Sequence, residues 1–272
     1  MVYLITGAGF LCKELLKDLL PTKSKIRVYS RSQRSFKGVK EQFGEPKNLT
    51  LIQGDIRDKD DLLMAMQGVD KVIHTACEKH VDWCEKFKKE AFKINYIGTY
   101  NVLFAAHMSK VKKFLFISTD KAVTPITTYG DTKHYAEELV LHFGSATVKT
   151  AIVRYGNVWA SSHSVIPLWD ELSEKGKTLQ LTDEEMTRFF ISPKQAVDLV
   201  LDSMKKMKGG EIFIPTLKSV KMIDIIKEKY PKSKYEITGI RGKEKIHEEL
   251  EIGYSSKDTL VSYKELMKEL KK

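Results

Sequence analysis

The sequence is poor in cysteine, in proline and in long hydrophobic runs. Its 272 residues include three cysteines and seven prolines. An odd number of cysteines gives no framework of paired disulfides and favours a reducing compartment, so we predict a cytoplasmic protein. The apolar stretch Val2–Cys12 ends at Lys13, well short of a bilayer span, and lacks the basic flank of a signal peptide. We therefore predict no membrane association.

The charge is strongly positive, with 46 Lys and Arg against 36 Asp and Glu and a net charge of +10. Such a charge suits nucleic acid, a membrane surface or an enzyme that binds several phosphates. The lysines are spread along the chain without interleaved aromatic residues, and those at the C-terminal end alternate with glutamates. This pattern is typical of a solvated helix face, so we predict no nucleic-acid partner.

Short apolar runs alternate with amphipathic helical stretches through the first 155 residues, and the rhythm breaks after Tyr155. Strict alternation predicts an α/β fold, a Rossmann-like doubly wound parallel sheet with a smaller mixed C-terminal lobe for the substrate. The predicted strands are Val2–Thr6, Lys25–Ser30, Leu49–Gln53, Lys71–Thr75, Lys113–Ser118 and Thr147–Val153, and the predicted helices are Leu11–Leu20, Lys59–Met66, Phe92–Ser109, Tyr129–Phe143 and Pro193–Met207.

A glycine-containing loop follows the first predicted strand and opens the first helix, with the sequence TGAGFLC from Thr6 to Cys12. Gly7 allows a tight turn, and Gly9 lets the backbone approach a pyrophosphate at the helix N-terminus. The alternative is an ordinary turn in which the two glycines have no role in ligand binding. In this context we predict a dinucleotide site, with contacts from Gly7, Gly9, Phe10 and Leu11.

The end of the second strand indicates which dinucleotide binds. An acidic residue there would hold the ribose hydroxyls of NAD, and none is present. Ser30, Arg31 and Arg34 instead offer a hydroxyl and guanidinium groups that suit a phosphate ester, which favours NADP, although both arginines could simply belong to a solvated loop. Further cofactor contacts are predicted at the ends of the third and fourth strands, from Asp55, Ile56, Thr75 and Ala76.

Tyr129 and Lys133 lie four residues apart and so share one face of a predicted helix. A free phenol is a weak base because its pKa is about 10. A nearby ammonium and a positively charged nicotinamide would favour the phenolate, so we predict that Tyr129 is a base and that Lys133 also holds the nicotinamide ribose. The catalytic interpretation of this pair is supported by its position one helix after a strand that ends in Ser118-Thr119-Asp120-Lys121.

These features resemble the extended short-chain dehydrogenase/reductases, and among them the inverting UDP-N-acetylglucosamine 4,6-dehydratases (5-epimerising) of polysaccharide biosynthesis. The resemblance covers nearly the whole chain, and the Thr-Asp-Lys element is specific to this group among sugar-nucleotide enzymes. The matching stretches are Tyr29–Arg31, Gly54–Asp58, Lys79–Val81, Ser118–Ala122, Tyr129 with Lys133, Arg154–Val158, Thr182-Asp183, Met186–Phe189, Gly210–Phe213, Gly239–Arg241, Glu244-Lys245 and His247-Glu248.

The resemblance implies a dehydration that recycles a tightly bound NADP. Tyr129 would take the proton of the sugar 4-hydroxyl while a hydride leaves C4, with Thr119 bonded to that hydroxyl. Lys121 would then remove the C5 proton, and Asp120 would protonate the departing 6-hydroxyl. Hydride would return to C6, and C5 would be reprotonated from the opposite face.

These roles require a neutral Lys121 and a protonated Asp120, each away from its ordinary state at neutral pH. A coupled and partly desolvated pair provides both forms when one proton moves from Lys121 to Asp120. The alternative is a surface ion pair at a strand end, which contributes little.

The resemblance also implies a UDP-sugar pocket. Its partner would be UDP-N-acetylglucosamine or a related UDP-sugar, and we expect a homo-oligomer. The implied substrate-binding residues are Lys79 and His80 at the sugar, Asn157, Arg188 and Arg241 at the diphosphate, and Glu244 at the uridine ribose.

The chain departs from the family pattern at several places. The glycine loop is one residue shorter, and Cys12 replaces its last glycine. Gly242-Lys243 stands where Pro-Gly is usual, and residues 159–164 lack an expected arginine and glycine. A segment of several dozen residues after His247-Glu248 is missing, so the number of subunits does not carry over.

Three other functions compete with this prediction. A zinc site could use His74, Cys77, His80 and Cys84, but these residues run from a strand end into a helix and we predict no metal. A UDP-sugar 4-epimerase shares the tyrosine and hydride step but needs no acid–base pair for water loss. A non-catalytic NADP-binding regulator is the third alternative.

We also predict how the chain divides. Residues 1–163 together with 189–208 would form the NADP-binding Rossmann-like domain. Residues 164–188 together with 209–272 would form the smaller nucleotide-sugar-binding lobe.

Overall fold

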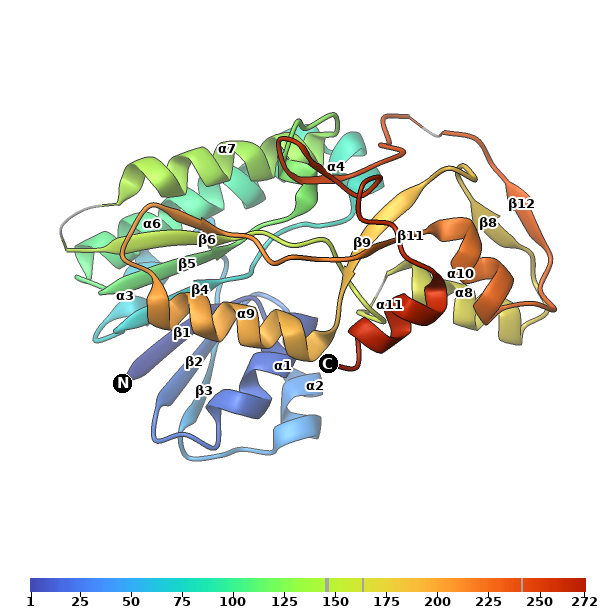
Figure 1. Cartoon of the computed structure of the whole chain (residues 1–272). Coiled ribbons are helices and arrows are strands. Elements are labelled where there is room, and N and C mark those ends of the chain that lie inside the picture. Colours follow the sequence, from blue (N-terminus) through green and yellow to red (C-terminus); the bar gives the residue numbers. More distant parts are fainter. Residues whose placement is uncertain (145–146, 163, 241) are drawn as a thin grey trace.

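A computed structural model describes residues 1–144, 147–162, 164–240 and 242–272. Its central element is a seven-stranded sheet in which all neighbouring strands run parallel (Figure 1). The strand order is β10-β6-β5-β4-β1-β2-β3, a doubly wound order extended by one strand. The strands are β1 (Val2–Thr6), β2 (Lys25–Ser30), β3 (Leu49–Gln53), β4 (Lys71–His74), β5 (Lys113–Ile117), β6 (Lys149–Val153) and β10 (Glu211–Phe213).

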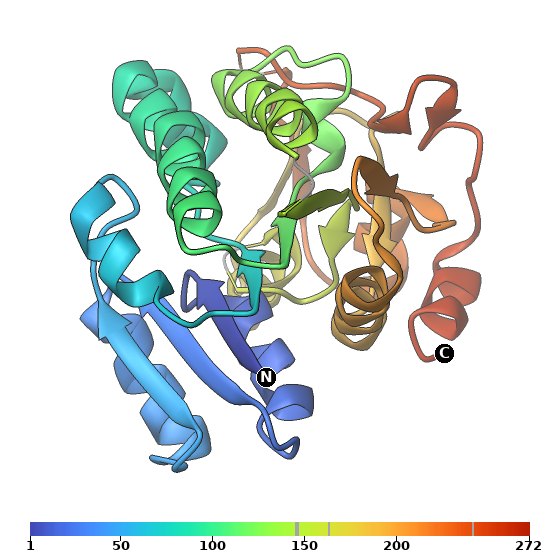
Figure 2. The same cartoon turned by 90° about the vertical axis from the view of Figure 1, so that its left-hand side faces the viewer.

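Different helices cover the two faces of the sheet (Figure 2). Successive strand side chains point to opposite faces, so that Leu4 joins one hydrophobic cluster and Ile5 the other. The Rossmann-like fold is thereby confirmed. The Ile5 face is covered by α1 (Phe10–Leu19), α2 (Gln33–Phe43) and α9 (Pro193–Lys206), and the Leu4 face by α3 (Lys59–Met66), α6 (Gly98–Met108) and α7 (Thr128–Phe143).

A third hydrophobic cluster lies in the later part of the chain, around the buried Trp169. It draws on residues from both segments of the predicted smaller lobe, and also on Phe190. The division of the chain by residue number remains a prediction. The elements here are α8 (Val165–Glu174), α10 (Met222–Lys229), α11 (Tyr263–Glu269), and the strands β7 (Asn157–Val158), β8 (Leu179–Leu181), β9 (Thr187–Ile191), β11 (Ser219–Lys221), β12 (Tyr235–Ile237), β13 (Glu249–Glu251) and β14 (Tyr254–Ser255).

The prediction of one continuous helix over Phe92–Ser109 is wrong, because a π-helical turn precedes α6. The chain forms α4 (Val81–Lys86), α5 (Lys88–Phe92) and a π-helical turn, η1 (Lys93–Ile97), before α6 begins. Inside this turn the buried Asn95 donates to the carbonyl of Glu78 at 2.9 Å and accepts from its amide at 2.7 Å. A π turn often marks a functional region, and this one fixes the segment that follows β4.

The C-terminal part of the chain is held to the central sheet by Arg154, a residue that also forms a buried ion pair. Arg154 binds both carboxylate oxygens of Glu137 on α7, and both side chains are at most 10% exposed. The same guanidinium donates to the carbonyl of Leu250 at 2.8 Å. Strand β13 is therefore attached beside the end of β6, which Arg154 follows.

Candidate active site

A cavity of about 1280 Å³ opens at the carboxyl ends of the central strands and extends to the hydrophobic cluster around Trp169. Ligands of open α/β sheets bind at this edge. Arg34 and Asp120 are not among its lining residues, and Arg241 lies outside the described residues. The predicted site residues that line it are Gly7, Gly9, Phe10, Leu11, Ser30, Arg31, Asp55, Ile56, Thr75, Ala76, Lys79, His80, Thr119, Lys121, Tyr129, Lys133, Asn157, Arg188 and Glu244.

The glycine loop has the close backbone approach that the sequence predicts. Gly7 has a φ of +87°, and a Cβ atom there would lie 2.9 Å from the Thr75 hydroxyl. Its amide donates to the carbonyl of Tyr29 at 2.7 Å. Gly9 precedes the first turn of α1, whose amides make no hydrogen bond to a capping side chain. The residues present therefore fit a dinucleotide whose phosphates lie at this helix N-terminus.

Cys12 occupies the position where the family pattern has its last glycine. The thiol is fully buried in the hydrophobic cluster between α1 and the sheet. Burial raises the pKa of Cys12 to about 12. It therefore packs as a small apolar residue and does not enter the cavity.

The second strand ends in a basic environment. Arg31 lines the cavity with a side chain that is 54% exposed, and its guanidinium lies 3.9 Å from the Asp55 carboxylate. Asp55 accepts from Arg57 at 2.7 Å, and this hydrogen bond holds its pKa below the ordinary value. Asp55 is thus already paired, which leaves Arg31 exposed toward the cavity.

The turn after β5 holds the predicted acid and base. Thr119 caps the 3₁₀ turn η2 (Asp120–Ala122), accepting from the Lys121 amide, and its hydroxyl donates to Asp120 Oδ1 at 2.9 Å. The Lys121 ammonium donates to the same oxygen at 3.2 Å. Asp120 is fully buried, and its Oδ2 has no hydrogen-bond partner among the described residues. The pair is therefore not the exposed surface ion pair considered as the alternative.

Tyr129 lies next to this turn because α7 packs tightly against it. A Cβ atom at Gly130 would lie 2.5 Å from the carbonyl of Lys121, so a larger residue would push the helix away. The hydroxyl of Thr127 caps the helix by accepting from the Gly130 amide at 3.0 Å. Glycine at 130 is the sequence feature that brings the tyrosine and the lysine into one cavity.

The partners of the Lys133 ammonium are groups other than the Tyr129 hydroxyl. This ammonium donates to the carbonyl of Ile117 at 2.7 Å and lies 3.8 Å from the centre of the Phe116 ring. Burial raises the pKa of Tyr129 well above its ordinary value and lowers that of Lys133. The side chains of this chain therefore keep the phenol protonated, and a positive charge from a bound group is needed to favour the phenolate.

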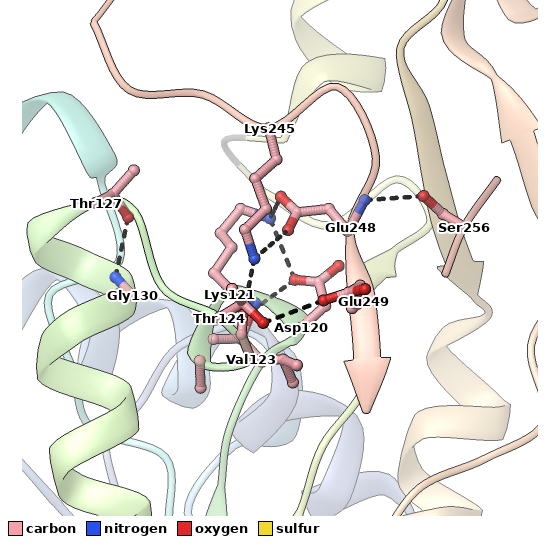
Figure 3. A network of polar contacts seen from close by, with 12 residues as sticks. Asp120, Lys121, Val123, Thr124, Thr127, Gly130, Lys245, Glu248, Glu249 and Ser256 are labelled. Carbon is pink, nitrogen blue, oxygen red and sulfur yellow. Dashed lines mark hydrogen bonds and ion pairs between the residues drawn. The ribbon is translucent and has the colours of Figure 1, made fainter. Parts of the chain in front are cut away.

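A third ionisable group joins Asp120 and Lys121, and the sequence analysis gave it no role. The carboxylate of Glu248 lies 3.0 Å from the Lys121 ammonium and is 3% exposed (Figure 3). Burial raises the pKa of Asp120, and the negative charge of Glu248 raises it further. Burial lowers the pKa of Lys121, but Asp120 and Glu248 together raise it above the ordinary value. The sequence signal that could have indicated Glu248 is the stretch His247-Glu248, which is among those that match the family resemblance.

Arg188, predicted at the diphosphate, and Glu244, predicted at the uridine ribose, contact each other. Arg188 is buried and donates to Glu244 at 3.1 Å and to the carbonyl of Ile246 at 3.0 Å. Glu244 also accepts from the hydroxyl of Thr182. This places a fixed guanidinium at the wall of the cavity, where a phosphate can compete with the carboxylate.

Lys79 follows β4 and reaches across the cavity, where its ammonium donates to the carbonyl of Ser162 at 3.0 Å. The carboxylate of Glu78 accepts from the ring of His80, with 2.6 Å between the two atoms. Asn157 of β7 also lines the cavity. These residues place charged and amide groups in the cavity wall.

The residues considered for zinc lie in separate environments. The ring of His74 is buried between the hydroxyls of Thr6 and Thr99, at 2.5 and 2.9 Å. The thiol of Cys84 faces the carbonyl of Glu78. Within the described ranges, no group of three His, Cys, Asp or Glu side chains is arranged to hold a metal ion.

A comparison with protein families decides the assignment. The family model of the polysaccharide biosynthesis protein matches residues 3–269. The chain belongs to the polysaccharide biosynthesis protein family. One family relative, UDP-N-acetylglucosamine 4,6-dehydratase (inverting) of Campylobacter jejuni, is 40% identical over 96% of this chain and 79% of its own.

The chain is also similar to an archaeal protein and to a solved bacterial structure. "Uncharacterized membrane protein MJ1061" of Methanocaldococcus jannaschii is 41% identical over 90% of this chain and 78% of its own. The X-ray structure of Pen from Bacillus thuringiensis is 36% identical, covers 92% of this chain and 82% of its own, and has a TM-score of 0.87. None of the helices in the described part of this chain is long and apolar enough to cross a bilayer.

Proposed function

We propose that this chain is an NADP-dependent UDP-N-acetylglucosamine 4,6-dehydratase that inverts C5. The observation that carries the proposal is the grouping of Thr119, Lys121 and Tyr129 in one cavity with the glycine loop, with Asp120 directly behind Lys121. The identity with the Campylobacter dehydratase supports the substrate and the reaction. An epimerase has no use for a buried acid–base pair, so the pair argues against that alternative.

The side chains divide the reaction between them. Tyr129 removes the proton of the 4-hydroxyl, and Thr119 orients that hydroxyl. Lys121 removes the C5 proton, which the 4-keto group has made acidic, and Asp120 protonates the 6-hydroxyl as it leaves. When bound, NADP+ accepts the hydride from C4 and returns it to C6, so it is regenerated in each turnover. As hydride adds to C6, C5 takes up a proton on the face opposite to the one it lost, and the product is a UDP-2-acetamido-2,6-dideoxy-4-hexulose.

The experiment is incubation of the purified protein with UDP-N-acetylglucosamine and NADP+, followed by mass spectrometry of the nucleotide sugar. The proposal predicts a product lighter than the substrate by one water. A product of unchanged mass that co-elutes with UDP-N-acetylgalactosamine would assign the chain as an epimerase. Bound NADP without turnover would assign it as a regulator.

The preference for NADP over NAD is tested at Arg31. We expect Arg31→Ala to raise the KM for NADP+ by about tenfold or more and to leave the KM for NAD+ nearly unchanged, because the guanidinium would pair with the 2′-phosphate. Arg34→Ala is the matched control, since Arg34 does not line the cavity. Equal effects of Arg31→Ala on both cofactors would contradict the assignment.

A further inference from the structure

Glu248 enters the active site from the far end of the chain, just before β13. Its carboxylate points at the Lys121 ammonium, on the opposite side from Asp120 (Figure 3). The ammonium therefore lies between two buried carboxylates, at 3.2 Å from Asp120 and 3.0 Å from Glu248. Lys121 retains 24% exposure and lines the cavity, so it faces both carboxylates and the substrate space.

The position of Glu248 is fixed by its backbone. Its amide donates to the hydroxyl of Ser256 at 2.9 Å, and that hydroxyl is 2.7 Å from the hydroxyl of Thr187. The second carboxylate oxygen, Oε2, accepts no hydrogen bond from the described residues and lies 3.8 Å from the Lys245 ammonium. A buried carboxylate with an oxygen left without a hydrogen bond is costly, so tying two segments together is a poor explanation for it.

We propose that Glu248 is a positioning residue that takes a proton from Lys121, so that Lys121 can act as a neutral base while Asp120 keeps the proton it donates. The inference rests on the proposed function, because it assumes the roles of Lys121 and Asp120 in water loss. It replaces the expectation that Asp120 alone receives the proton of Lys121.

The proton count supports a third group. With Asp120 protonated, Lys121 as ammonium and Glu248 ionised, the three side chains share two protons. Moving one proton breaks a Lys121 N–H bond and forms a Glu248 O–H bond, which leaves a neutral amine beside a protonated Asp120. Lys121 then gains the C5 proton while the C6–O bond breaks and Asp120 gives its proton to the departing hydroxyl. The total of two protons is unchanged.

Without substrate, the surrounding charges favour a protonated Asp120, an ammonium on Lys121 and an ionised Glu248, the distribution from which the transfer starts. Burial and the charge of Glu248 raise the pKa of Asp120, which favours its protonated form. Burial raises the pKa of Glu248, but Lys121, Arg188 and Lys245 lower it more strongly. If the substrate diphosphate pairs with Arg188, one of these lowering charges is neutralised. Substrate binding would then raise the pKa of Glu248 and promote the proton transfer in the loaded enzyme.

The first test measures Lys121 directly in the protein without substrate. Acetic anhydride acetylates only neutral amines, so the pH dependence of Lys121 acetylation, mapped by peptide mass spectrometry, reports its pKa. Because Glu248 raises that pKa, we expect Glu248→Gln to speed acetylation at neutral pH by about tenfold, which corresponds to one pKa unit. Glu249→Gln is the matched control, because Glu249 accepts from Thr124 and not from Lys121. An unchanged acetylation profile in Glu248→Gln would overturn the coupling.

The second test measures turnover. We expect Glu248→Gln to lower kcat about 100-fold, because Asp120 then loses the charge that favours its protonated form and must itself take the proton of Lys121. Reduced nicotinamide should still form in the first turnover, because oxidation at C4 does not need Glu248. Removing the negative charge also lowers the pKa of Asp120, so the loss of activity with rising pH should begin at lower pH than in the native enzyme. Glu248→Asp keeps a carboxylate and should recover part of the activity.

The outcomes of these tests separate a failure of the inference about Glu248 from a failure of the proposed function. Native kcat and pH dependence in Glu248→Gln, or equal loss of C4 oxidation and water elimination, would overturn the inference. If Glu248→Gln does not fold, the pH profile and acetylation of Glu248→Asp decide in its place, and values identical to the native protein overturn it. A native protein that removes no water would refute the proposed function, whereas the acetylation result would still decide the coupling.

Discussion

Replacing Tyr129 with phenylalanine is expected to reduce turnover of UDP-N-acetylglucosamine by about 10³-fold. The hydroxyl is the group that takes the proton of the sugar 4-hydroxyl, and such general-base groups contribute about 10²–10⁴-fold. No later step can begin without this oxidation, so neither product nor reduced nicotinamide should accumulate. Steady-state kinetics and nicotinamide absorbance measure both quantities.

The control for this variant lies on the same helix. Tyr135 is 52% exposed on α7, so Tyr135→Phe should keep native kinetics. The folded state of Tyr129→Phe is checked by its thermal unfolding midpoint and by retained NADP binding. Turnover within tenfold of the native rate in a folded Tyr129→Phe variant would remove Tyr129 from its role as the base.

Replacing Lys121 with methionine is expected to stop the reaction one step later. Methionine keeps the length of the side chain but cannot remove the C5 proton, so water loss should fall by about 10³-fold. Oxidation at C4 should continue, and reduced nicotinamide should therefore build up in this variant, in contrast to Tyr129→Phe. Rapid-mixing absorbance with mass spectrometry of the quenched sugar separates the two patterns.

Lys112→Met serves as the matched control, since Lys112 is 77% exposed in a surface pair with Asp70. A product that lacks one water, formed at the native rate by Lys121→Met, would show that another group removes the C5 proton. Loss of both steps with an unchanged unfolding midpoint would place Lys121 in the first oxidation instead.

Six strands of the central sheet were predictable because each is an apolar run bounded by turn residues. The seventh, β10, was not predicted, and it lies in the range that the prediction assigned to the smaller lobe. Strands β1, β2 and β3 have the predicted bounds, while β4 and β5 end one residue earlier than predicted. The missed helix α2 buries only Phe36 and Val39 and contains Gly38, so it has few apolar residues. The local signal for it is Ser32, whose side chain caps the helix by accepting from the Ser35 amide.

The active-site residues at strand ends were predictable for a related reason. Parallel strands bring their carboxyl ends to one edge, so the glycine loop, the Thr119–Lys121 turn and the start of α7 had to meet there. Glu248 reaches the same point from a distant part of the chain, and its contact with Lys121 depends on how the last segment packs. The direction of the Lys133 ammonium also depends on packing, because the Ile117 carbonyl competes for it.

The central claim is that the hydride removed from C4 returns to C6 of the same sugar. Its most direct test is incubation of the native protein and NADP+ with UDP-N-acetylglucosamine deuterated at C4, followed by NMR of the product. We predict a product that lacks one water and carries the deuterium at C6. Deuterium that remains at C4 in a product of unchanged mass, or that is lost to free cofactor or solvent, would contradict the account.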